Sequence, residues 1–353
     1  MPPRPGQKPG QKPGRTRASD LPPAGWGWRE YLAALIEAQG SLAAIAWKLI
    51  ELSERGDGPD DVASVERALR RLRERGQRDG GVWGQRLLRR FGVPRSIEDR
   101  LRWMGLYHSP FNDLPLGLCE DQLRLWDQPP ISASRARVWL QLAATSVALR
   151  RRAFDKARAA LDGAVATLAV RGPDEARPAE ASIEAALARA YLESRIGTEQ
   201  AVTALLQQAE RALAETPLDR GDRACFVARL IDQRAFRLNV RGEHAAALAL
   251  YQTLPSDDVH PFASYRREAG LAFGCLRTGL LPEARRHALL ACEHAGDGGY
   301  TRLRVMSLLM LARLEEAPAA AQTLARAAGI AGRLGDDELQ LRVTRATAGR
   351  AGG

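Results

Sequence analysis

The sequence lacks the features that mark membrane spans, secreted proteins and disulfide frameworks. No stretch approaches the roughly 18 to 20 consecutive apolar residues that a membrane-spanning helix requires. The N-terminus has no compact apolar core of the kind found in signal peptides, so we expect a cytoplasmic protein without a membrane partner. The cysteines are far apart and form no C-x-x-C pair, which predicts reduced thiols on apolar helix faces: Cys119, Cys225, Cys275 and Cys292.

Catalytic and metal-binding signatures are missing as well. There is no Walker lysine motif, no dinucleotide glycine fingerprint and no H-E-x-x-H. His287 and His294 have no cysteine or carboxylate pattern around them that would form a zinc site. His108, Ser109 and Asp113 could be imagined as a hydrolytic triad, but they crowd into one loop and no nucleophile-elbow glycines flank the serine. The sequence therefore predicts no enzyme activity, no metal, no cofactor and no small-molecule substrate.

Aromatic residues make up only 6% of the chain, which argues against a protein built from β-sheets. Alanine and leucine dominate the apolar residues, and both favour helices. With 45% apolar and 27% charged residues over 353 positions, the chain can bury a core and form two or three modules. An all-α fold is predicted.

The formal net charge of +10 is concentrated in two segments. Residues 1–20 carry five basic side chains against one aspartate, a net charge of +4, and residues 61–102 carry twelve arginines against six acidic residues, a net charge of +6. Together these segments account for the whole net charge. The chain has only four lysines, so a general preference for arginine explains the residue type but not the clustering. A localised basic region favours a polyanionic partner such as nucleic acid.

Composition also divides the chain into successive parts. Residues 1–25 contain a repeated Gly-Gln-Lys-Pro and almost no apolar side chains, which predicts a disordered basic arm. All seven tryptophans lie before residue 140, so the two ends of the chain should have different cores. We expect a small helical domain at 26–102, a connector rich in proline and aromatic residues at 103–135, and a second domain that begins after it.

Residues 136–335 show internal repetition. Small and apolar residues recur with steps of 3, 4, 5, 4 and 3 in two units that are 37 residues apart: Ala235, Leu238, Gly242, Ala247, Tyr251 and Leu254, then Ala272, Cys275, Gly279, Ala284, Ala288 and Ala291. The same steps run through Leu309, Ala312, Glu316, Ala321, Ala325 and Ala328, and earlier through Thr145, Ala148, Arg152, Ala157, Leu161 and Ala164. A less regular copy covers 188–209. Because residues three or four apart share a helix face, each unit predicts two helices joined by a turn.

This repeat pattern resembles the tetratricopeptide repeat (TPR) family. The resemblance implies a right-handed α-solenoid of about five helical hairpins over 136–335, with 336–353 as a C-terminal capping segment and flexible tail. The sequence departs from the family where Arg152, Arg195 and Glu316 replace the turn glycine, and its period of 37 exceeds the family's period of about 34. An ordinary alanine-rich helical bundle is the alternative.

The N-terminal domain resembles a winged helix-turn-helix (HTH) domain. Apolar stripes predict helices over 28–38 and 42–49, and Asp60 or Asp61 caps a third helix. The glycine-rich residues 76–84 would form the wing, although the linker before the third helix is longer than in the motif. In that family the third helix enters the DNA major groove, which implies DNA contacts from the arginines on and after it: Arg67, Arg70, Arg71, Arg73, Arg78, Arg86, Arg89 and Arg90. The alternative is a solvated helix face on which Glu66 and Glu74 pair with neighbouring arginines.

The solenoid resemblance implies a groove that is open to a peptide or to a partner's helix. Arginines in the groove or on its rim would favour an acidic protein partner: Arg234, Arg237, Arg241, Arg266 and Arg267. The sequence thus predicts a non-enzymatic adaptor or regulator that binds a protein and, through its N-terminal domain, double-stranded DNA. The alternative function is a protein-only scaffold or assembly subunit that binds no nucleic acid.

Overall fold

The structure is a computed structural model of the chain that describes residues 26–51, 61–75, 80–170, 179–257 and 259–351. Within these ranges the chain forms the α-helices α1 to α17 and two short 3-10 helices, η1 and η2, and contains no strand. The predicted all-α class is therefore confirmed. The predicted arm at 1–25 lies outside the described residues.

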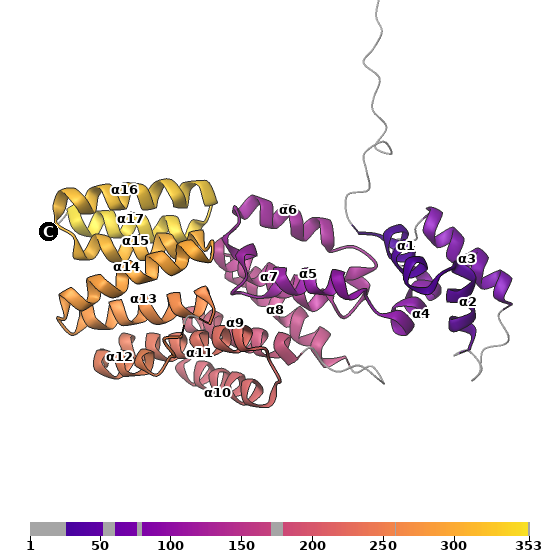
Figure 1. Cartoon of the computed structure of the whole chain (residues 1–353), viewed down its shortest axis with the longest axis horizontal. Helices are drawn as coiled ribbons and strands as arrows, with labels where there is room; N and C mark the ends of the chain where they lie inside the picture. The colour runs from indigo at the N-terminus through magenta and orange to yellow at the C-terminus, as the bar shows by residue number, and fades with distance from the viewer. Residues whose placement is uncertain (1–25, 52–60, 76–79, 171–178, 258, 352–353) are drawn as a thin grey trace, which may run out of the picture.

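The N-terminal unit contains α1 (Trp28–Gln39), α2 (Leu42–Ile50), α3 (Val62–Arg75) and α4 (Gly81–Phe91). Ser41 caps α2 by accepting a hydrogen bond from the Ala44 N–H at 3.1 Å. The four helices enclose a core of their own, which includes Tyr31, Leu32, Ile45, Leu69 and Leu87. Figure 1 shows this unit in indigo at one end of the molecule.

The expected wing is not found where the structure describes it. Gly81–Gly84, predicted as part of a glycine-rich wing, form the first turn of α4 instead. The small size of Gly84 has a packing role, because a Cβ there would lie 2.7 Å from ring atoms of Trp28. The glycines therefore let α4 approach the indole of α1 closely.

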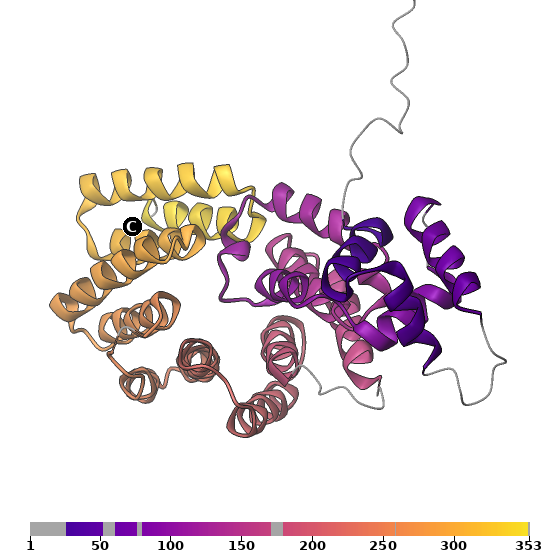
Figure 2. The same cartoon turned by 45° about the vertical axis from the view of Figure 1, so that its right-hand side comes forward.

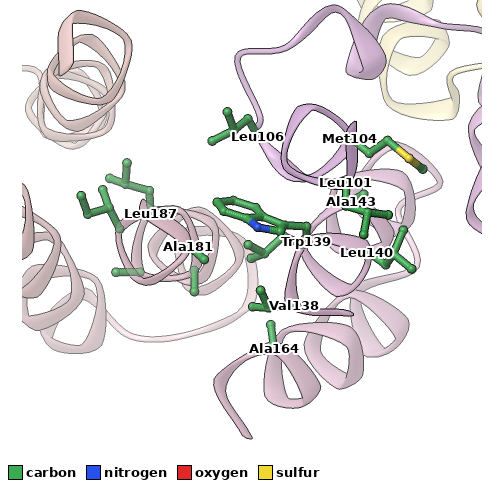
Figure 3. Packing of buried hydrophobic residues seen from close by; sticks show 14 of the residues in the cluster. Leu101, Met104, Leu106, Val138, Trp139, Leu140, Ala143, Ala164, Ala181 and Leu187 are labelled. Carbon is green, nitrogen blue, oxygen red and sulfur yellow. The ribbon is translucent and has the colours of Figure 1, made fainter. Parts of the chain in front are cut away.

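The predicted connector at 103–135 is largely helical, and several of its apolar side chains are buried. It contains the end of α5 (Arg95–Gly105), η1 (Pro110–Asp113), α6 (Leu116–Trp126) and η2 (Ile131–Ala133). In Figure 3 the ring of Trp139, 2% exposed, lies among Leu101, Leu106 and Leu187. A large part of the main core is thus made by this segment together with the helices that follow it.

The remaining helices form consecutive antiparallel hairpins, which we call the hairpin array (137–351). Its pairs are α7 (Arg137–Arg150) with α8 (Phe154–Ala169), α9 (Ala179–Ile196) with α10 (Glu199–Glu215), α11 (Arg220–Val240) with α12 (His244–Gln252), α13 (Pro261–Arg277) with α14 (Leu281–Asp297), and α15 (Thr301–Leu314) with α16 (Ala317–Leu334). A last helix, α17 (Asp337–Ala351), follows. The described residues of the predicted C-terminal capping segment form this helix, and Asp336, just before it, has a fully buried side chain.

Three turns between hairpin helices lie where the repeat pattern predicted them, at positions 152, 242 and 279. Arg195, which the pattern placed at a turn, lies inside α9 instead. Gly242 and Gly279 have φ of 81° and 82°, and Arg152 adopts φ of 57° at the equivalent position. Positive φ is easy for glycine and rare for other residues. Around these turns the predicted small residues Ala157, Ala247 and Ala284 are fully buried.

The last predicted repeat is shifted by one residue. Ala321, Ala325 and Ala328 were expected to face the core but are exposed. Their neighbours Ala320, Leu324 and Ala327 are buried instead. Because α15 ends at Leu314 and α16 begins at Ala317, the turn is shorter here than the pattern assumed.

Figures 1 and 2 show the hairpins following one another along an arc whose last helices return to the α5–α7 region. There α17 packs against α7. The buried Asp336 carboxylate accepts hydrogen bonds from Arg150 Nε at 2.8 Å and from Arg302 Nε at 2.7 Å. The first and last hairpins of the array are therefore joined by an ion cluster in which Arg150 and Asp336 are buried and the Arg302 side chain is 14% exposed.

A bridging segment (residues 102–114) lies against the first helices of successive hairpins. The Tyr107 N–H donates to Glu184 of α9 at 3.2 Å, and Tyr300, which precedes α15, donates its hydroxyl to the His108 carbonyl at 2.9 Å. Arg229 of α11 pairs with Glu184 at 2.5 Å and lies 4.6 Å above the Tyr107 ring. The chain's own segment thus occupies this face of the array.

Candidate interaction sites

α3 exposes a row of arginines opposite the core of the N-terminal unit. The spacing of its buried residues turns the intervening positions outward: Val65, Leu69 and Leu72 are at most 4% exposed. Arg67, Arg70 and Arg71 are exposed, whereas Arg73 is half-buried. Three of the arginines predicted to bind DNA therefore lie on one solvent-facing stripe.

The α3 stripe surrounds an open depression of about 410 Å³, lined by Ser64, Arg67, Arg70, Arg71 and Glu74. Arg67 donates to Ser64 Oγ at 3.0 Å and to the Ala63 carbonyl at 3.2 Å. Arg70 pairs with Glu66 at 2.7 Å across one helical turn. Exposed pairs of this kind contribute at most about 1 kcal/mol, so these guanidinium groups can exchange partners for an anion.

The other arginines predicted to bind nucleic acid are placed differently. On α4 the Arg86 guanidinium stacks 4.8 Å from the Trp83 ring, while Arg89 and Arg90 are exposed. The described part of α4 contributes no side chain to the lining of the α3 depression. Arg78 lies outside the described residues.

Two of the five predicted groove arginines are structural. Arg266 donates to Asp232 at 2.9 Å and to the Tyr107 hydroxyl at 3.2 Å, and it lies beside the rings of Phe262 and Tyr265. Arg267 donates to the Leu254 carbonyl and pairs with Glu268. Both side chains, expected to face a partner, therefore make their contacts within the chain, Arg266 with Asp232 and the distant Tyr107, and Arg267 with its neighbours Leu254 and Glu268.

The other three groove arginines, Arg234, Arg237 and Arg241, line one pocket of about 380 Å³ between α10, α11 and α12. Sequence reasoning missed the rest of its lining, whose members come from three different helices: Thr203, Leu206, Gln207, Leu238 and Leu250. The signal that could have found part of it is the spacing of Arg234, Arg237, Leu238 and Arg241 on one face of α11.

Each pocket arginine pairs with a glutamate at the rim. Arg234 makes a two-bond contact with Glu210 at 2.9 and 2.6 Å. Arg237 pairs with Glu199, and Arg241 lies 3.1 Å from the same carboxylate and 2.6 Å from Glu243. Hydrogen bonds from these arginines hold the pKa values of Glu199 and Glu210 below their usual value. The glutamates are therefore charged at neutral pH.

His108 and Asp113, two of the residues considered as a hydrolytic triad, have separate partners, and the buried Ser109 hydroxyl has no hydrogen-bond partner among the described atoms. His108 Nε2 lies 3.0 Å from Asp222 Oδ1, and Asp113 Oδ1 accepts the Arg302 N–H at 2.5 Å. His108 and Ser109 are at most 5% exposed. Burial dominates the environment of Asp113 and raises its pKa to about 6. The contacts of His108 and Asp113 hold the bridging segment in place.

The remaining histidines and the cysteines show no metal site within the described ranges. His287 Nδ1 lies 2.5 Å from Glu268 Oε2, and no group of three or more His, Cys, Asp or Glu side chains in the described ranges could hold a metal ion. The four cysteines are free, and burial raises the pKa of Cys119, Cys225 and Cys275. Thiols with raised pKa values are poor nucleophiles at neutral pH.

No single helix in the described parts of the chain is both long and apolar enough to cross a membrane. Only α1 and α2 taken together satisfy the length and composition requirement, as a pair bent by 87°. Both helices bury side chains such as Tyr31 and Ile45 in the N-terminal core.

Compared with known proteins, the chain matches no family model, no curated protein and no solved structure, so its function has to be argued from its own geometry.

Proposed function

We propose that the chain is a non-enzymatic regulator or adaptor that binds double-stranded DNA through α3 and a protein partner through the hairpin array. One observation carries the DNA-binding part of this proposal. Arg67, Arg70 and Arg71 are exposed around a single depression on a helix whose opposite face is fixed in a core. Guanidinium groups suit phosphate and guanine, which accept two hydrogen bonds side by side.

In this proposal α1 to α3 form an HTH-like unit with α3 as the recognition helix. α2 packs against α3, and both pack against α1. An α-helix with side chains is about 10 to 12 Å wide and fits the major groove, which is about 12 Å wide. Phosphate contacts from α3 would position the unit, and any arginine that reaches a base edge would read sequence.

The proposed protein-binding part treats the hairpin array as a TPR-like solenoid. Positive φ at positions 152, 242 and 279 and buried alanines on both sides of these turns support this interpretation. Stacked hairpins of this kind present long surfaces on which peptides bind. The bridging segment occupies one such surface, so a partner has to use another.

The DNA-binding proposal is tested with the full chain, a labelled duplex and about 50 and about 200 mM salt. The variant carries Arg67→Gln, Arg70→Gln and Arg71→Gln, all on exposed positions. We expect the wild type to lose affinity steeply as salt rises, because phosphate contacts release counterions. The variant should bind about tenfold or more weakly, with a salt slope that is smaller by roughly 2 to 3.

A matched control removes the same charge elsewhere, through Arg285→Gln, Arg326→Gln and Arg333→Gln on exposed faces of α14 and α16. It should bind DNA like the wild type. Circular dichroism would establish that both variants keep their helices. Equal affinity of the α3 variant and the control would contradict the proposal, because the basic residues 1–25 remain in both. Absence of binding by the wild type at low salt would leave a protein-only scaffold.

A further inference from the structure

The pocket between α10, α11 and α12 combines three cationic side chains with an apolar floor. Arg234, Arg237 and Arg241 follow one another on one stripe of α11. Leu206, 2% exposed, and the half-buried Leu238 and Leu250 lie beneath them. Figure 2 shows α11 almost end-on between α10 and α12. A volume of about 380 Å³ is in the range of sites that hold a few amino-acid side chains.

Arg237 lies deeper in the pocket than the glutamates at the rim. The Arg237 side chain is 14% exposed, whereas Glu199 is 62% exposed and Glu210 is 52% exposed. Arg237 also has a buried Nε that finds no hydrogen-bond partner among the described atoms. The buried charge of the site is therefore that of Arg237, and the carboxylates that balance it lie in solvent.

Exposed ion pairs are weak because water and salt screen them. A ligand carboxylate that enters the pocket can therefore replace Glu199 or Glu210 at little cost. Guanidinium groups accept carboxylates in a planar arrangement with two hydrogen bonds, as Arg234 already does with Glu210. The leucine floor adds a contact that an inorganic anion cannot use.

From this geometry we infer that the pocket binds an extended segment of a partner protein that presents a carboxylate beside an aliphatic side chain. The carboxylate contacts Arg237 and Arg234, and the aliphatic side chain lies on Leu238 and Leu250. Thr203 and Gln207 at the edge can hydrogen-bond the peptide backbone. This inference rests on the proposed partner-binding function and is independent of DNA binding by α3.

The test is a titration of the full chain followed by NMR signals of arginine Nε–H groups and leucine methyl groups. The probe is the capped peptide Leu-Asp-Leu-Glu, and the matched peptide is Leu-Asn-Leu-Gln. We expect saturable shifts of the Arg234, Arg237 and Leu238 signals with the acidic peptide, and an affinity at least about tenfold weaker for the amide peptide. Inorganic phosphate should shift the arginine signals alone.

Three double variants make the outcome decisive. Arg234→Gln with Arg237→Gln should abolish the saturable shifts, while Arg285→Gln with Arg326→Gln on α14 and α16 should leave them unchanged. Glu199→Gln with Glu210→Gln should strengthen binding about threefold to tenfold, because the competing carboxylates are removed.

Three results would overturn the inference: no saturable shift with the acidic peptide, equal binding of the two peptides, or weaker binding after the glutamates are replaced. If phosphate shifted the leucine methyl signals as the peptide does, the pocket would be a general anion site and the inference would also fail. DNA binding measured on the same samples shows whether the α3 function stands separately, since the pocket variants leave α3 intact.

Discussion

At the scale of single residues, the contact between Trp28 and Gly84 joins the first and last helices of the N-terminal unit. Trp28 is 4% exposed, and an added Cβ on Gly84 would lie 2.7 Å from its ring. Gly84 has ordinary helical geometry, so its role is steric. Two of the glycines that suggested a wing, Gly80 and Gly84, lie where the Trp28 indole leaves no room for a Cβ.

We expect Gly84→Ala to lower the free energy of unfolding of the N-terminal unit by about 1 to 3 kcal/mol, because the ring has to move in a packed core. Gly329→Ala on α16 is the control, since a Cβ there meets nothing within 4 Å. It should be neutral or stabilise by up to about 1 kcal/mol through higher helix propensity. Hydrogen exchange of amides in 28–91 measures the first effect, and a Gly84→Ala protein with unchanged protection would contradict it.

Asp113 is a second residue whose burial predicts a measurable effect, a dependence of stability on pH. Burial raises its pKa to about 6, above the value of about 3.9 in an unfolded chain. The folded state then binds the proton more tightly, so the stabilising contribution is complete below pH 4 and is lost as pH rises through 6. The charged carboxylate is tolerated at neutral pH because Arg302 lies beside it.

Asp113→Asn keeps an oxygen that can accept the Arg302 N–H and removes the titration. We expect the two proteins to have similar free energies of unfolding near pH 4. As pH rises to 7, the free energy of unfolding of the variant should increase relative to that of the wild type. Urea unfolding at several pH values measures this difference, and a difference independent of pH would show that Asp113 does not titrate in this range.

At the scale of helices and turns, the sequence predicted where turns lie better than it predicted the contacts that their residues make. The step pattern placed Arg152 at a turn that elsewhere holds glycine, and the structure gives it φ of 57°. The pattern could not show why arginine is accepted there. Its guanidinium pairs with Glu338 of α17 at 2.7 Å, a contact between residues far apart in sequence.

The one-residue shift in α16 has a simple origin. Alanines in α16 offer small side chains in more than one register: Ala317, Ala319, Ala320, Ala321, Ala325, Ala327 and Ala328. Spacing alone cannot choose between registers when alanine is present in each. Leu324 is the larger apolar residue, and its burial decides the helix face.

The candidate sites also differ in whether local sequence or long-range contacts determine them. Outward arginines on α3 follow from helix periodicity and the buried stripe, which are local properties. Arg266 could not be assigned from sequence, because its partners Asp232 and Tyr107 reach it from other helices. A charged residue on an apolar helix is consistent with either a buried pair or an exposed site until the fold is known.

At the scale of the whole molecule, the boundary predicted near residue 135 does not separate independent parts. The bridging segment contributes Leu106 and Phe111 to the main core. Its Tyr107 and His108 pack against Phe226 and Phe262 of the hairpin array. The array and residues 95–135 should therefore fold as one cooperative unit, whereas the N-terminal unit has its own core.

Two truncated chains test this division. A chain that begins at residue 95 keeps α5 and the bridging segment, and we expect it to melt cooperatively within a few degrees of the array in the full protein. A chain that begins at residue 136 exposes Trp139, Phe226 and Phe262, each of which contributes about 1.5 to 3 kcal/mol when buried. It should melt about 10 °C or more lower, or not cooperatively at all. Equal melting temperatures of the two chains would show that the array folds without its bridging segment.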